Sequence, residues 1–276
     1  MIDALTFRFR PLRGQVLKAM VLRDIAVTRS YRLAFVLDVF FGVLNLAMFF
    51  FISKTFADVQ GADLHGAPSY FAYASVGIAI TIVVDAASTG LAQRIRGEQL
   101  AGTLEALLTQ PVKLAEIAFG LAAFPFLFAM VRAAFYLVIA GIWFRVDLAQ
   151  TDWVGFGVTL LVAGAAFTAV GILLGAVTLV IKLGDVLVGM VIYTMGLISG
   201  AFFPVDVLPA WIEPIGRVVP TRFAFDGIRS SVFLGGGWAG DAAALVATTV
   251  VGVPLAVWVF GLAINHAKRR GSLGQY

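Results

Sequence analysis

The chain has 276 residues, of which 61% are hydrophobic and 13% charged, and its mean hydropathy is +0.96. This is more apolar than a soluble core of that size requires, whereas several bilayer-spanning helices account for it. The sequence has no cysteine, which excludes disulfides, thiol catalysis and thiolate metal sites. The net charge is +4, but the sequence has no pattern of interleaved positive and aromatic residues suited to nucleic-acid bases, so no nucleic-acid partner is expected.

Six segments are long and apolar enough, or nearly so, to cross a bilayer, which takes about 20 residues. We therefore expect an all-α, polytopic membrane protein with six transmembrane helices, over residues 33–53, 70–92, 114–142, 154–181, 186–203 and 242–264. The fifth of these segments is the shortest. The whole chain, 1–276, is expected to be a single transmembrane domain, with a surface segment over 1–32, a six-span bundle over 33–264 and a tail over 265–276.

The positive charges predict the orientation of the spans, because Lys and Arg near span ends resist translocation. Fourteen of them fall on the side of the two termini and five on the opposite side, with Arg132 inside the third span. Both termini are therefore expected in the cytoplasm. Residues 12–32 are expected to form a helix lying on the membrane, where their basic side chains suit an anionic leaflet. A disordered basic tail is the alternative, and the absence of an apolar h-region predicts no cleavable signal peptide.

A charged stretch over residues 94–111 separates the second and third spans. Most residues between 97 and 108 favour a helix, and Pro111 cannot continue one. Apolar anchors at i, i+3 and i+4 spacing are typical of a short helix that docks in a groove of a partner. The anchors here are Leu100, Leu104, Leu107 and Leu108. Glu98 and Glu105 lie on one face and can meet basic residues of a partner, although a solvated helix on lipid headgroups is the alternative.

The segment over residues 204–232 combines four prolines with many apolar side chains. The prolines prevent one continuous helix, yet the segment is too apolar for a free loop. Non-helical backbone at membrane depth must be buried in protein or line a water-filled cavity. Short re-entrant helices partly embedded in the outer leaflet are therefore expected between the fifth and sixth spans, and a simple amphipathic lid is the alternative.

Few ionisable residues lie within the spans, where each costs about 2.5–3.5 kcal/mol on insertion scales. Asp38 lies near the cytoplasmic end of the first span and is expected to be structural. Asp85 and Arg132 are the deepest, at about 10 Å and 25 Å by a rise of 1.5 Å per residue. A direct pair between them is therefore not favoured over a role of Arg132 in attracting an anionic head group.

Catalytic and metal-binding patterns are missing from the sequence. His65 and His266 lie on opposite sides of the expected membrane, too far apart for a metal site or a catalytic dyad. No GxSxG, HExxH or GxxxxGK[ST] pattern occurs. If this protein uses ATP, another chain must bind it.

Two blocks of the sequence resemble the type-2 ATP-binding-cassette exporter permease family. The first block consists of Arg96, Gly97, Glu98, Gly102, Thr103, Leu104, Glu105, Leu107, Leu108, Pro111, Glu116, Ile117 and Gly120. The second consists of Ser199, Gly200, Ala201, Phe202, Phe203, Pro204, Leu208, Pro209, Pro220 and Arg229. The two blocks occur in the order in which the family has them, inside a six-span chain.

The resemblance implies a transmembrane permease subunit of an exporter in the cell (inner) membrane, moving an amphipathic or lipid-linked substrate outward by alternating access. It implies no catalysis and no cofactor on this chain, since ATP and Mg would bind a separate nucleotide-binding ATPase subunit, and a second permease copy, identical or related, would complete the path. The coupling helix that docks the ATPase would include Glu98, Leu100, Gly102, Thr103, Leu104, Glu105 and Leu108. The outer gate would include Phe203, Pro204, Leu208, Pro209 and Pro220, and the substrate path candidates are Asp85 and Arg132.

Two other classes of protein stay open as alternatives. A proton-coupled secondary transporter would need internal hydropathy symmetry and functional carboxylates, and only Asp85 comes close. A membrane-embedded enzyme that modifies lipids would need a cluster of His, Asp, Ser or Cys near an interface, and the sequence offers none.

Overall fold

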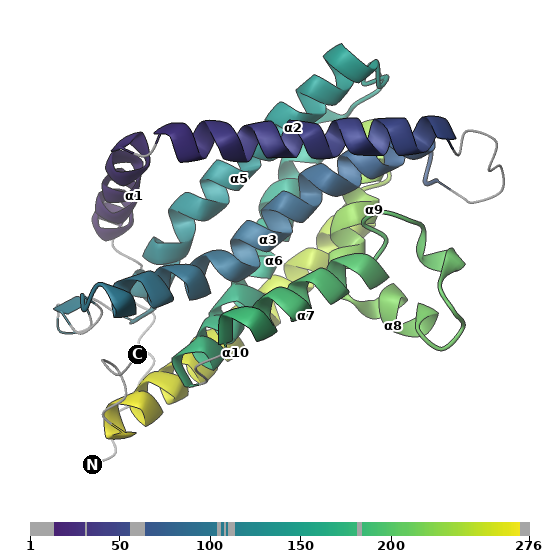
Figure 1. Ribbon diagram of the computed structural model, residues 1–276. Coiled ribbons are helices and arrows are strands. Elements are labelled where there is room, and N and C mark those ends of the chain that lie inside the picture. Colours follow the sequence, from purple (N-terminus) through teal and green to yellow (C-terminus); the bar gives the residue numbers. More distant parts are fainter. Residues whose placement is uncertain are drawn as a thin grey trace.

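The computed structural model describes residues 14–30, 32–55, 64–103, 106–107, 109, 114–180 and 184–270 (Figure 1). These residues form helices and turns and contain no strand, which confirms the expected all-α class. The long helices are α1 (Gly14–Ser30), α2 (Arg32–Thr55), α3 (Tyr70–Leu100), α5 (Leu114–Phe144), α6 (Trp153–Val180), α7 (Gly184–Ile198) and α10 (Ala239–Arg270). The shorter ones are η1 (Val205–Val207), α8 (Glu213–Val218) and α9 (Pro220–Phe233).

Five of the described helices, α2, α3, α5, α6 and α10, are long and apolar enough to cross a membrane by length and composition. The expected count of six spans is not confirmed, because α7 has only 15 residues. At 1.5 Å per residue it measures about 22 Å, less than the roughly 30 Å of a hydrocarbon core. The helix ends early because Gly200 takes φ +91° and the Ala201 N–H donates to the Gly196 carbonyl, a bond typical of a glycine-ended helix.

The two helices α3 and α6 form the centre of the bundle. In their most apolar windows 78% and 61% of residues are buried, against 6% for α2 and 17% for α10. Helix α6 packs on α10 and α3, and α3 packs on α5. A Cβ atom at Gly171 of α6 would lie 2.4 Å from the Ala87 carbonyl oxygen of α3, so glycine is what allows these helices to approach closely.

The bundle has two opposite ends, and different elements lie at each of them. Helix α1 and the last turns of α3 and α10 lie at the left of Figure 1, whereas α8 and α9 lie at the right. Under the orientation expected from the basic residues, the left end is cytoplasmic and the right end is the outer one. Helix α1 exists as expected and packs on α5, and its position relative to the membrane stays a prediction.

Asp152 fixes the start of α6 beside α9. Its Oδ1 atom accepts hydrogen bonds from the backbone N–H groups of Gly155 and Val154, each at 3.0 Å, while Trp238 Nε1 donates to Oδ2 at 2.8 Å. The backbone bond from Gly155 and the bond from Trp238 lower the pKa of Asp152, because both stabilise the charged carboxylate. This N-cap ties the loop before α6 to the loop before α10.

Candidate functional site

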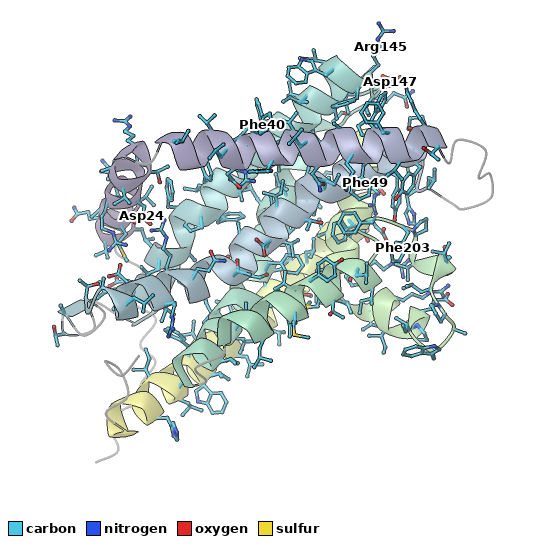
Figure 2. The ribbon with its side chains drawn as sticks, in the orientation of Figure 1. Asp24, Phe40, Phe49, Arg145, Asp147 and Phe203 are labelled. Carbon is cyan, nitrogen blue, oxygen red and sulfur yellow. The ribbon has the colours of Figure 1, made fainter. Side chains whose placement is uncertain are left out.

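Four charged side chains, Arg23, Asp24, Arg94 and Glu98, join α1 to the last turns of α3, and we call them the α1–α3 network. Asp24 is buried, with 1% of its side chain exposed, and its position between the helices is labelled in Figure 2. Arg23 Nε donates to Asp24 Oδ1 at 3.1 Å, and Arg94 Nη2 lies 3.4 Å from Asp24 Oδ2. Arg23 Nη1 donates to Glu98 Oε1 at 2.9 Å. The network therefore fixes α1 against the end of α3.

The charges of the network support one another. Partial burial acts to lower the pKa of Arg23, but the carboxylates of Asp24 and Glu98 outweigh it and raise that pKa above its usual value. Glu98 was expected to meet basic residues of a partner. In the structure its carboxylate is bound within the chain, by Arg23 and by the Thr103 hydroxyl.

The helix expected over residues 97–108 is not continuous, because a turn interrupts it, although residues 106 and 107 are helical again. Helix α3 ends at Leu100, and Ala101 and Gly102 form a turn in which Gly102 takes φ +70°. The Thr103 N–H donates to the Glu98 carbonyl at 2.9 Å, the bond that closes a helix ending on a left-handed glycine. The residues on both sides of Gly102 favour a helix, so helix propensity alone did not predict that α3 ends here. A glycine in such a position is the usual sequence signal of a helix end.

The expected apolar anchors of the docking segment differ in their surroundings. Leu100 is 67% exposed, and Gly102 and Thr103 are exposed beside it. Leu107 instead packs into a core cluster that includes Met20 of α1, so it holds the segment on the bundle. Three further candidate residues lie outside the described residues: Leu104, Glu105 and Leu108. The exposed turn over residues 100–103 is what the described chain offers to a partner.

Replacing Asp24 by asparagine should lower the free energy of unfolding by about 2 kcal/mol, because the negative charge that pairs with Arg23 and Arg94 is lost while both arginines remain. For a chain of this size that corresponds to a fall of roughly 4–8 °C in the melting temperature, measured on the purified protein in detergent. Lys18→Gln, on an exposed part of α1, is the matched control and should change stability little. An unchanged melting temperature for Asp24→Asn would show that the network does not stabilise the fold.

Short helices lie between α7 and α10, where the prolines predicted them. Pro204 is buried and precedes η1, and Pro220 is the first residue of α9, a helix position that suits proline. Phe203, labelled in Figure 2, and Leu208 are half-buried, and Pro209 is exposed. The five expected gate residues therefore lie in one segment between α7 and α10, and their gating role and membrane depth stay predictions.

Arg229 of α9 is fully buried, although the charge count placed it among the five basic residues on the side opposite the termini. Its guanidinium carbon lies 3.5 Å from the centroid of the Tyr73 ring, and its Nη2 donates to the Ala201 carbonyl at 3.1 Å. The Tyr73 hydroxyl donates to the Gly200 carbonyl at 2.8 Å. No carboxylate of the described chain forms a salt bridge with Arg229. Arg229 and Tyr73 together hold the turn after α7 against α3.

Arg132 of α5 forms an ion pair with Asp38 of α2, and its Nη2 donates to the Tyr136 hydroxyl at 3.4 Å. Asp85 of α3 is exposed and has no ion pair within 4.0 Å to a described residue. The two deepest charges are thus not paired with each other. Depth counting could not find Asp38 as the partner, because α2 packs on α5 at an incline and brings its first turns to the middle of α5 (Figure 1).

The part of the chain that the structure describes has no group of three or more His, Asp or Glu residues able to hold a metal ion. Its distinctive features are five membrane-length helices, an exposed turn fixed to α1 at one end, and a segment of short helices locked by Arg229 at the other. These features define a polytopic α-helical membrane protein.

The comparison with known families identifies the class further. A model of the ABC-2 type transporter family matches residues 15–233, which is more than half of the chain, and the chain belongs to that family. It is therefore a membrane permease of the ABC transporter type, a transmembrane component that is not itself catalytic. A search of curated proteins found no match.

Proposed function

We propose that this chain is the permease of an ATP-driven exporter that moves an amphipathic or lipid-linked substrate outward by alternating access. A separate ATPase subunit binds ATP and Mg, and a second permease copy completes the path. The observation that carries the proposal is the exposed turn over residues 100–103, which projects from the end of the most buried helix and is fixed to α1 through Glu98 and Arg23.

Helix α3 suits the transmission of movement from one end of the molecule to the other. It has 31 residues and measures about 46 Å. At one end it carries Glu98 and the exposed turn, and at the other Tyr73 contacts Arg229 and the Gly200 carbonyl. A force applied by an ATPase at residues 100–103 therefore acts on a helix whose far end holds the segment proposed as the outer gate.

The surface of α2 supports a second permease copy as a neighbour. Its most apolar window is only 6% buried, and Phe40 and Phe41 are 54% and 64% exposed. Lipid or a second copy must cover such a surface in a membrane. The excess of basic residues at the end of α1 and α10 supports cytoplasmic termini in the inner membrane.

Asp85 and Arg132 stay candidates for the substrate path. Asp85 is exposed on α3, whereas Arg132 is engaged by Asp38 and Tyr136. An anionic cargo head would have to compete with Asp38 for Arg132. We therefore propose Asp85, which forms no ion pair with a described residue, as the polar side chain of the path that contacts the cargo.

Leu100→Asp should weaken binding of the ATPase subunit about 30-fold, because a charge in an apolar anchor costs the roughly 2 kcal/mol typical of an interface hot spot. Leu104→Asp and Glu105→Lys should likewise leave the permease inserted while uncoupling ATP hydrolysis from transport. The measurement is the affinity of the purified permease for its co-expressed ATPase.

The conservative Leu100→Met variant is the matched control and should bind like the wild type, since it keeps an apolar side chain of similar volume. Wild-type affinity and coupling in all three disruptive variants would rule out docking through this segment.

A further inference from the structure

A cavity of about 290 Å³ lies between the outer ends of α2, α3 and α5. Three aromatic residues line the cavity, Phe50, Phe71 and Phe144, one from each helix. We call these three rings the aromatic floor. Their ring centroids lie 5.0–5.3 Å apart. Lys54, Arg145 and Asp147 also line the cavity, so it combines an apolar floor with charged groups.

Both cations of the cavity lack a carboxylate partner among the described residues. The Lys54 ammonium lies 4.6 Å from the centroid of the Phe50 ring, where the face of the ring attracts it. Asp147, the acidic lining residue, uses Oδ1 to accept the Ala149 N–H at 2.9 Å and forms no salt bridge within the described chain. The described lining therefore has a net positive charge.

The other basic residues of the outer side are engaged elsewhere. Arg217 forms ion pairs with Asp206 and Glu213, Arg222 with Asp226, and Arg229 is fully buried. Basic residues are scarce on the outer side of a membrane protein. Here the two that have no described carboxylate, Lys54 and Arg145, line one cavity.

The backbone conformation of Arg145 is a second feature that points to a functional site here. Arg145 directly follows α5 and takes φ +58°, the left-handed conformation in which helices usually end on glycine. The next N–H, of Val146, donates to the Ala140 carbonyl at 3.1 Å. An arginine in this conformation is strained in a way that glycine is not, and such outliers cluster at functional sites. The strained residue is thus an exposed arginine that lines the cavity.

We propose that this cavity binds a phosphate-headed anionic lipid of the outer leaflet. Its phosphate lies between Lys54 and Arg145, and the first carbons of its chains lie against the aromatic floor. Arginine suits this ligand because its planar fork binds phosphate oxygens in pairs. The site depends on the proposed orientation of the chain, which makes these helix ends the outer ones.

The test is the retention of phosphatidylglycerol by the full-length chain, extracted from nanodiscs that contain phosphatidylglycerol and phosphatidylethanolamine and analysed by native mass spectrometry. Lys54→Gln and Arg145→Gln should each lower retention of phosphatidylglycerol about fivefold, and the double variant about 25-fold, at the roughly 1 kcal/mol per basic residue expected near a charged lipid surface. Retention of phosphatidylethanolamine should stay the same. Arg217→Gln is the matched control, since it removes an outer positive charge away from the cavity.

Arg145→Gly separates binding from folding. It should lose phosphatidylglycerol as Arg145→Gln does, while its melting temperature stays the same or rises, because glycine relieves the strained backbone. Unchanged retention in the double variant, or an equal loss in Arg217→Gln, would overturn the proposal in favour of general charge attraction. Displacement of the lipid by millimolar inorganic phosphate would overturn it in favour of a free-phosphate site. ATPase docking is measured separately, so failure of this site leaves the proposed transport function standing.

Discussion

Replacing Arg229 by alanine should lower the free energy of unfolding by about 3–5 kcal/mol, the range typical of truncating a large, fully buried side chain. The change removes the contact with the Tyr73 ring and leaves the Ala201 carbonyl without its donor. Arg229→Lys should lose less, because it keeps the charge but not the planar fork. Thermal unfolding of the purified variants in detergent measures the effect.

Arg217→Ala is the matched control for Arg229→Ala. Arg217 is an exposed arginine whose surface ion pairs contribute little, so this variant should melt within about 2 °C of the wild type. Tyr73→Phe should cost about 1 kcal/mol, since it removes only the hydrogen bond to the Gly200 carbonyl. Equal melting temperatures for Arg229→Ala and Arg217→Ala would contradict the locking role of Arg229.

Asp38→Ala and Arg132→Ala should each destabilise the inserted protein by about 3 kcal/mol, because each leaves one charge of a membrane-embedded pair uncompensated. The double variant Asp38→Ala with Arg132→Ala should recover most of the folded protein. The measurement is the amount of folded permease in the membrane, by detergent extraction and size-exclusion chromatography.

Asp85→Ala with Arg132→Ala is the matched control for this cycle. Asp85 forms no ion pair with Arg132 in the described chain, so this combination should not recover. Recovery with Asp85→Ala but not with Asp38→Ala would show that Arg132 pairs with Asp85 and that the contact with Asp38 is unimportant.

Much of the fold could be predicted from the sequence, because long apolar segments leave little choice but helices in a bilayer. The errors occurred where one glycine decides the course of the backbone. Gly102 ends α3 inside a stretch of good helix formers, and Gly200 ends α7 before it reaches the length of a span. Hydropathy and helix propensity are averages over many residues, so they do not detect such a position. A single residue in the left-handed conformation is enough to end a helix.

The candidate site was harder to predict than the fold. The partners of Glu98 and Arg132 lie 75 and 94 positions away, at Arg23 and Asp38, so pairing depends on how helices cross. Burial of Arg229 had a signal in the sequence, since it lies one helical turn after Phe225, on the apolar side of a segment that forms an amphipathic helix. The signal was missed because arginine is almost never fully buried without a partner.

The central claim is that this permease works with an ATPase on another chain. The most direct measurement is ATP binding and hydrolysis by the purified chain alone and by the complex obtained when it is co-expressed with its ATPase subunit. We predict no nucleotide binding by the chain alone, and hydrolysis in the complex that responds to the permease and loses this response in Leu100→Asp. Specific ATP binding by the pure chain, or failure of any ATPase to copurify with it, would contradict the account.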